Sequence, residues 1–212
     1  MFSRGLGCHF GIDASIMFDQ SWEQIFSERE WGKYPPEHVI RFVARNWYRV
    51  PDRSAVRLLD VGCGPGACSW YMAREGFSVS GIDGSPSGIR QARERLAREG
   101  LHAEFKVGDF CRPLPWPDAS FDGAIDNVAI CYAQGYWANV IREVRRVLKP
   151  AGRFHSVWFG TRLTKPVEGR ARYVTEAELR TLFSSVFVNI VVDTHLYTEG
   201  EYTVELLMAQ AW

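Results

Sequence analysis

The chain has 212 residues, 46% of them hydrophobic and 24% charged, a composition typical of one globular domain. Its 25 basic and 25 acidic side chains cancel, which excludes a protein that holds nucleic acid or anionic lipid through overall charge. No apolar run approaches the ~20 residues of a membrane span, and the five cysteines form no Cys-x-x-Cys pair. We therefore expect a soluble, cytoplasmic protein with reduced thiols and no metal site.

The first fifty residues show no alternation of strands and helices. Pro35 and Pro36 precede a helical pattern whose apolar side contains Val39, Phe42 and Trp47. Because this segment has no strand of its own, we expect residues 1–50 to be a helical lid across the top of a core that spans residues 55–212. The two parts together form one domain, 1–212.

From residue 55 onward, short apolar strands alternate with amphipathic helices. The strand patterns cover residues 56–61, 77–82, 103–107, 121–126 and 154–159. Such alternation predicts a parallel sheet with helices on both faces. Near the end of the chain, Thr175 to Glu178 form a capping box that begins a helix. Two further strand patterns, 186–192 and 202–208, are joined too closely for a crossover helix, so they must pair antiparallel.

Four of the predicted strands end in residues that suit a ligand, which binds an open parallel sheet at the carboxyl ends of its strands. Asp60-Val61-Gly62-Cys63-Gly64 is a turn in which missing Cβ atoms let a ligand approach backbone N–H groups. Asp83, 21 residues after Gly62, is spaced to accept both hydroxyls of a ribose. The next two strands end at Gly108-Asp109-Phe110 and at Asp126-Asn127.

The glycine turn also fits the dinucleotide fingerprint, so a nicotinamide-dependent oxidoreductase is one alternative. Asp60 disfavours the pyrophosphate of such a cofactor, and it suits S-adenosylmethionine, which carries an ammonium and a sulfonium. No Tyr-x-x-x-Lys or comparable hydride-transfer constellation follows the turn. A non-catalytic S-adenosylmethionine-binding module is the other alternative.

Residues 59–66 resemble the first motif of class I S-adenosylmethionine-dependent methyltransferases of the small-molecule type. Later landmarks of that family match in order over residues 55–160: Ile82-Asp83, Gly108-Asp109-Phe110, Phe121-Asp122, Ile125-Asp126 and residues 147–152. The resemblance implies an α/β, Rossmann-like, doubly wound and mostly parallel seven-stranded sheet with a C-terminal antiparallel hairpin. Ala151 stands where the family usually has a glycine, and Gly84 leaves the packing of the adenine edge open.

The same resemblance implies roles for individual residues. Asp60, Gly62 and Gly64 would hold the methionine part of the cofactor, and Asp83 would bind its ribose. Adenine would lie against Asp109 and Phe110, and the methyl group would lie beside Asp126 and Asn127. Tyr34, before the N-terminal helix, is a candidate to close over the cofactor, although packing is an equally simple role for it.

The implied reaction is methyl transfer from S-adenosylmethionine to a small molecule, with S-adenosylhomocysteine as the product. Because positioning and desolvation can supply much of this catalysis, no dedicated base is required, and none is identified. His155 in the fifth strand is the candidate base, with a core histidine as its alternative. Neutral charge and a compact lid favour a small acceptor over nucleic acid, while the acceptor's identity and the oligomeric state stay open.

A basic segment follows the fifth strand. Residues 160–172 hold Arg162, Lys165, Arg170 and Arg172 against Glu168. We expect some of them to bind an anionic group of the acceptor. A solvated basic loop is the alternative interpretation.

Overall fold

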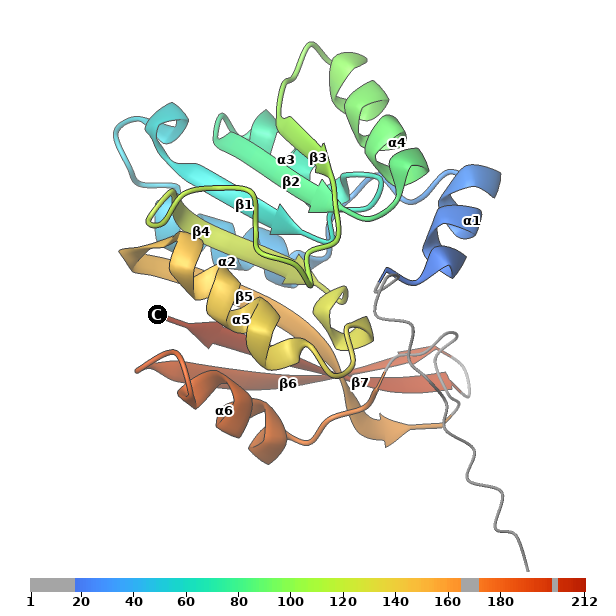
Figure 1. Ribbon diagram of the computed structural model, residues 1–212, viewed down its shortest axis with the longest axis vertical. Helices are drawn as coiled ribbons and strands as arrows, with labels where there is room; N and C mark the ends of the chain where they lie inside the picture. The colour runs from blue at the N-terminus through green and yellow to red at the C-terminus, as the bar shows by residue number, and fades with distance from the viewer. Residues whose placement is uncertain (1–17, 165–171, 200–201) are drawn as a thin grey trace, which may run out of the picture.

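A seven-stranded sheet runs through the computed structural model, with helices on both of its faces (Figure 1). The structure describes residues 18–164, 172–199 and 202–212. The strand order is β3-β2-β1-β4-β5-β7-β6, in which β7 pairs antiparallel with both β5 and β6 and the other neighbours are parallel. The predicted Rossmann-like sheet with a C-terminal antiparallel hairpin is confirmed.

The first four strands agree with the sequence patterns to within a residue or so, and the last three differ in their bounds. Their bounds are β1 Arg57–Val61, β2 Ser78–Asp83, β3 Glu104–Val107, β4 Phe121–Asn127, β5 Leu148–Leu163, β6 Ile190–Glu199 and β7 Tyr202–Ala211. β5 is longer than expected, and β6 begins four residues later than the pattern at 186–192 predicted. The reason is that the backbone N–H groups of Val186 and Phe187 still bond to the Phe183 carbonyl and continue the helical winding.

The helices divide into two layers and one outlying element. Their bounds are α1 Gln20–Glu28, α2 Glu37–Trp47, α3 Ala67–Arg74, α4 Pro86–Ala97, α5 Trp137–Val147 and α6 Glu176–Ser184, with short 3₁₀ turns at η1 Arg53–Ala55 and η2 Ile130–Tyr132. α5 and α6 pack on one face of the sheet, and α2, α3 and α4 contribute to the core on the other. α1 lies beyond the carboxyl ends of the parallel strands (Figure 1).

The position of α2 corrects the prediction that residues 1–50 form one lid. Its apolar side is buried as expected, but it packs on the sheet: a Cβ on Gly123 of β4 would lie 2.3 Å from the Trp47 ring. Phe42 stacks on His155 of β5 with ring centroids 4.9 Å apart. Because the apolar face of α2 is buried against β4 and β5, α2 is a layer of the core. In the described part of the N-terminal segment, α1 is the helix at the carboxyl ends of the strands, and a lid function for it stays a prediction.

Candidate functional site

The glycine turn after β1 has the backbone that only glycine adopts without strain. Gly62, Gly64 and Gly66 have φ angles of +67°, +46° and +77°. The N–H groups of Gly62 and Cys63 donate to the Ile82 carbonyl at 2.8 and 3.1 Å, and Gly66 N–H donates to the Cys63 carbonyl at 2.9 Å. Gly64 N–H donates to the Asp83 carboxylate at 2.8 Å. The protein's own oxygens accept from these amides, and a contact of the turn with a ligand stays a prediction.

The missing side chain of Gly62 instead makes room for the loop that follows β4. A Cβ at this position would lie 2.1 Å from the Cβ of Ala129 and 3.4 Å from Cε1 of Phe110. The loop is bent sharply, since Val128 has a φ of +62°, a conformation rare for a β-branched residue. The ends of β1 and β4 and the loop after β3 thus meet at Gly62, as the parallel arrangement of the strands predicts.

Asp60 is buried beneath this turn and caps the first turn of α3. Its side chain is 2% exposed and accepts from the Ser69 hydroxyl at 2.6 Å, with a further bond from the Ser69 amide. Burial raises the pKa of Asp60 to about 7, and the neighbouring carboxylates of Asp83 and Asp126 also act to raise it. The position favours a cation, because a positive charge would offset both the cost of burying the ionised Asp60 and the repulsion from Asp83 and Asp126.

Asp83 connects the glycine turn to the start of α4. One carboxylate oxygen accepts from Gly64 N–H and the other from Ser85 N–H, both at 2.8 Å. The residue is 6% exposed, and burial raises its pKa to about 6. Each oxygen keeps a second lone pair, so the carboxylate can still accept the two hydroxyls of a ribose.

Asp126 at the end of β4 is fully buried and holds the following loop. It accepts from the amides of Ala129 and Ile130 at 2.8 and 3.0 Å and from the Ser156 hydroxyl at 2.5 Å. Burial raises its pKa to about 6. Asn127 is half-buried beside it and is the more accessible of the two predicted residues.

Asp109 and Phe110 lie in the loop after β3 and are both half-buried. Asp109 accepts from the Cys111 amide at 2.8 Å, which shapes the loop. Phe110 packs toward the core under α5 while its ring edge faces Gly62. Together with Asp60, Asp83, Asp126 and Asn127, these residues occupy one edge of the sheet.

α1 adds side chains to this edge that the sequence analysis missed. The Phe26 ring, 6% exposed, would be 3.2 Å from a Cβ on Gly64 and 3.1 Å from one on Gly88. Trp22 packs edge-on against Tyr132 at 5.2 Å, and Glu23 accepts from the Ser85 hydroxyl and, at 3.1 Å, from the Ser87 amide. The sequence signal is limited to the four-residue spacing of Trp22 and Phe26, which places the two on one helix face but does not indicate what that face covers.

Tyr34 lies apart from these residues. It is 74% exposed, and its ring meets the edge of Trp70 in α3 with centroids 5.6 Å apart. Lys33 lies 4.5 Å above the same Trp70 ring and pairs with Glu99. These contacts hold the segment between α1 and α2 against the outside of α3 and α4. A cofactor contact of Tyr34 stays a prediction.

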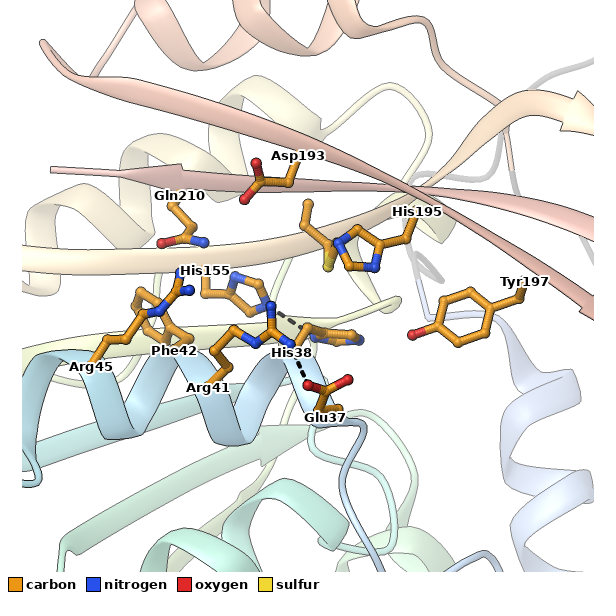
Figure 2. A pocket seen from close by; sticks show the side chains of 11 residues that line it. Glu37, His38, Arg41, Phe42, Arg45, His155, Asp193, His195, Tyr197 and Gln210 are labelled. Atoms are coloured by element: carbon orange, nitrogen blue, oxygen red, sulfur yellow. Dashed lines mark hydrogen bonds and ion pairs between the residues drawn. The ribbon is translucent and has the colours of Figure 1, made fainter.

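His155 lies in a small polar cavity between α2 and strands β5–β7 (Figure 2). Its Nε2 is 3.0 Å from Nδ1 of His38, and its Nδ1 has no partner among the described residues. Burial lowers the pKa of His155 to about 3 and that of His38 to about 4. The cavity of about 40 Å³ has room for a water molecule or two. His155 is uncharged at neutral pH, but a pKa this low makes it a weak proton acceptor and its side chain is 1% exposed, so its role as a base stays a prediction.

The basic segment is only partly described. Arg162 donates to Glu205 at 2.6 Å, and Arg172 lies 3.7 Å from Glu178 and 5.3 Å over the Trp137 ring. Lys165, Glu168 and Arg170 lie outside the described residues. The two described arginines already have acidic partners and therefore do not strengthen the case for an anionic acceptor. Such an acceptor stays a prediction.

Comparison with known proteins agrees with this arrangement. Residues 58–152 match the family model of a methyltransferase domain. This part of the chain belongs to the class I S-adenosylmethionine-dependent methyltransferase family. The match runs from β1 into the start of β5 and includes every predicted site residue except Tyr34 and His155.

Individual relatives are similar over part of their length. The chain is 32% identical over 150 residues to the 27-O-demethylrifamycin SV methyltransferase of Amycolatopsis mediterranei, covering 68% of this chain and 54% of that one. It is 31% identical over 130 residues to an S-adenosyl-L-methionine-dependent Diels-Alderase of Talaromyces variabilis, covering 58% and 44%. The chain thus spans about half the length of these curated relatives. A solved SAM-dependent methyltransferase of Methanosarcina mazei, 26% identical, superposes with a TM-score of 0.60 over 77% of this chain and 94% of that one.

Proposed function

We propose that the protein binds S-adenosylmethionine at the carboxyl edge of β1, β2 and β4 and transfers its methyl group to a small molecule. The observation that carries the proposal is the set of three buried carboxylates, Asp60, Asp83 and Asp126, within the family's domain. Among the described residues, none of the three takes part in a salt bridge. A cationic ligand would supply the positive charge that these buried carboxylates do not receive from a protein side chain in the described structure.

The geometry of the turn argues against a nicotinamide dinucleotide. A pyrophosphate needs free backbone N–H groups, whereas those of Gly62, Cys63, Gly64 and Gly66 already donate to protein oxygens. The start of α4, where the additional phosphate of NADPH would lie, is occupied by the Glu23 carboxylate. Repulsion from Glu23 and Asp83 would further weaken the binding of an anion there.

The residues present fit S-adenosylmethionine, which supplies an electrophilic methyl group on its sulfonium. The negative charge around Asp60 would stabilise the amino-acid part, and the free lone pairs of Asp83 would accept from the ribose. α1 covers the edge with Trp22 and Phe26, which would exclude water from the reacting centre. No side chain in the described part of the site is assigned as a base, so positioning is the main contribution we ascribe to the protein.

Aromatic rings continue from α1 toward the end of β5 and suggest where the acceptor lies. Trp22 meets Tyr132 at 5.2 Å, Tyr132 meets Phe159 at 6.4 Å, and Phe159 meets Tyr173 at 6.4 Å. This row follows the end of β4 at Asn127 and offers apolar surface, so we propose a largely apolar small molecule as the acceptor. The similarity to a methyltransferase that is named for a rifamycin substrate supports this class of acceptor.

Helix length, free thiols and net charge bear on the compartment of the protein and on the class of its acceptor. Within the described ranges, no helix combines the length and the apolarity that crossing a bilayer requires. The four described cysteines are free, which supports the proposal of a cytoplasmic protein. The zero net charge supports the proposal that nucleic acid is not the acceptor.

Thermal unfolding with S-adenosylmethionine, S-adenosylhomocysteine, NADH and NADPH tests the cofactor. A ligand present at a hundred times its Kd stabilises by ~2.7 kcal/mol, which corresponds to roughly 5–10 °C for a chain of this length. We expect this shift with the two adenosyl ligands and its loss in Asp83→Asn. A shift with a nicotinamide cofactor alone would overturn the proposal.

Transfer itself is tested with S-adenosylmethionine that carries a labelled methyl group and a panel of apolar alcohols, phenols, amines and acids. Label in an acceptor, with an equal amount of S-adenosylhomocysteine, supports the methyltransferase. Binding of S-adenosylmethionine without transfer to any member of the panel would instead favour a binding module or a Diels-Alderase, the activity for which one of the relatives is named.

A further inference from the structure

The ring of Phe18 lies where a side chain of residue 84 would project. An ideal Cβ built on Gly84 would be 2.1 Å from Cδ2, 2.4 Å from Cγ and 2.6 Å from Cε2 of Phe18. Gly84 directly follows Asp83, the candidate ribose acceptor, and precedes Ser85, which caps α4. Its φ is not in the left-handed region, so the backbone itself would accept any residue here. What glycine provides at position 84 is space for the Phe18 ring.

The contacts of α1 with α4 hold Phe18 in this place. α1 begins two residues after Phe18. Its Glu23 accepts from the Ser85 hydroxyl and the Ser87 amide. Gln91 donates to the carbonyls of Phe26 and Arg29 at 2.5 and 3.0 Å, and these bonds satisfy the open C-terminal end of α1. The position of the ring is therefore fixed by several bonds that do not involve Phe18.

A purine is flat and apolar on both faces, and a carboxylate that binds ribose does nothing for it. A nucleoside site therefore needs an apolar surface beside the carboxylate, and aromatic rings serve this purpose for every base. At the end of β2, the main chain supplies Asp83 but no such surface, because Gly84 has no side chain. The ring of Phe18, which is half-buried, is the apolar group in that position.

We propose that Phe18 is the apolar wall for the adenosine part of the cofactor, supplied by the N-terminal segment in place of a side chain at position 84. This inference rests on the proposed function, because it assumes an adenosyl ligand at Asp83. It makes the N-terminal segment part of the cofactor site. It also predicts that residues 18 and 84 are interchangeable in this role: one of them has to supply the wall, and there is no space for both.

The test measures the Kd of S-adenosylhomocysteine and of adenosine by calorimetry for the wild type and for four variants. Phe18→Ala should weaken both ligands by the same factor, roughly 5- to 150-fold, the range for truncating a stacked aromatic ring. Phe18→Tyr should bind like the wild type. Phe18→Ala combined with Gly84→Leu should recover most of the affinity, because leucine then provides the apolar surface from the strand end.

Gln91→Ala is the control for a loosened lid, since it removes two bonds to α1 and leaves residues 18 and 84 unchanged. The proposal is supported if Phe18→Ala weakens ligand binding, if adding Gly84→Leu restores the affinity, and if Gln91→Ala does not reproduce the loss. Equal affinity of Phe18→Ala and wild type would overturn it, and so would weakening that Gln91→Ala fully reproduces. If the combined variant does not fold, a Phe18→Tyr affinity as low as that of Phe18→Ala would overturn the proposal. Failure of the wild type to bind either ligand would instead contradict the proposed function.

Discussion

His38 and His155 face each other across the boundary between α2 and β5, with Nδ1 of the one 3.0 Å from Nε2 of the other. Both side chains are buried, and burial lowers their pKa values to about 4 and about 3. At neutral pH the pair is uncharged, and one nitrogen can donate to the other. The bond joins a helix of the N-terminal segment to the centre of the sheet.

This pair should make the protein sensitive to acid. Both folded pKa values lie below the ~6.5 of an unfolded histidine, so the unfolded state takes up protons first as the pH falls. The stability from the pair is fully present above pH ~6.5 and is lost progressively as the pH falls through the folded pKa values of about 4 and about 3. Unfolding monitored by circular dichroism should show that the combined variant His38→Leu and His155→Leu has a flatter dependence on pH between 6.5 and 4.

The exposed His102 is the control, because His102→Gln removes a histidine without touching the pair. An unchanged pH dependence in the combined variant would show that the pair does not govern acid stability. The same series addresses catalysis: a general base contributes about 10²- to 10⁴-fold, so a loss of that size in kcat for His155→Gln, with the Tm little changed, would identify His155 as the base.

Asp60 should make cofactor affinity and the stability of the free protein respond to pH in opposite directions. Its folded pKa of about 7 lies above the ~3.9 of an unfolded aspartate. As the pH falls from 8 to 6, the folded state binds the proton first and the Asp60 contribution to stability rises. A cationic ligand requires the ionised form, so its affinity should be roughly tenfold lower at pH 6 than at pH 8.

Calorimetric titration of S-adenosylmethionine at pH 6 and pH 8, for wild type and Asp60→Asn, isolates this effect from the titration of the ligand's own amine. The amide introduced by Asp60→Asn can still accept from Ser69 but cannot titrate, so the difference between the two proteins belongs to Asp60. Asp118→Asn, at a largely exposed carboxylate, is the matched control. The same ratio of affinities in Asp60→Asn and wild type would contradict the prediction.

Gly62→Ala should disrupt the cofactor edge more than its small size suggests. The left-handed backbone alone costs roughly 1–2 kcal/mol for a residue with a Cβ, and the new Cβ would overlap Ala129 at 2.1 Å. Gly135→Ala is the control for the backbone cost, since Gly135 has a φ of +83° and no neighbour within 4 Å of its Cβ. Denaturant unfolding should rank Gly62→Ala as the less stable variant.

Adding Ala129→Gly to Gly62→Ala should recover the part of the loss that comes from overlap. The combined variant should approach the stability of Gly135→Ala, and S-adenosylhomocysteine affinity should return with it. If Ala129→Gly recovers nothing, the Gly62 position acts through its backbone alone and the contact between the two turns is unimportant.

Arg162 should be more important for folding than for the acceptor. Glu205, its partner, is 5% exposed, so Arg162→Ala leaves a buried carboxylate without its cation. Because the arginine itself is 64% exposed, we expect a loss of only about 1–2 kcal/mol. Arg172→Ala, whose partner Glu178 is half exposed, should lose less than ~0.5 kcal/mol.

Denaturant unfolding compares the two arginine variants, and the acceptor KM is measured alongside. Combining Arg162→Ala with Glu205→Gln should restore stability, because the amide does not need a counter-ion. A raised acceptor KM in Arg162→Ala at wild-type stability would instead assign the arginine to acceptor binding.

The sequence predicted the sheet and the composition of its carboxyl edge because both depend on local patterns. Buried strands read as apolar runs, and the polar residues that follow them must share one edge in a parallel sheet. Asp60, Gly62, Asp83 and Asp126 were all placed in this way. The contribution of α1 was not predictable by the same means, since nothing local indicates that Phe26 packs beside Gly64, 38 residues away.

The partners of the backbone N–H groups in the glycine turn could not be predicted either. A glycine turn before a helix is compatible with amides that face a ligand and with amides that bond to the next strand. Here the Ile82 carbonyl and the Asp83 carboxylate accept from them, and only the register of β1 against β2 decides that. The same holds for His155, whose partner His38 lies 117 residues earlier in the chain.

Two side chains of α4, Gln91 and Arg95, bond to main-chain oxygens at the end of α1 and in the segment after it. Gln91 bonds to the carbonyls of Phe26 and Arg29, and Arg95 bonds to those of Trp31 and Gly32. These four bonds do not depend on which side chains the segment carries, but they do depend on how many residues lie between the carbonyls. Lys33 and Tyr34 add side-chain contacts with Trp70, but the gain or loss of one residue would move the carbonyls out of reach of Gln91 and Arg95, so we expect insertions and deletions here to be more damaging than most substitutions.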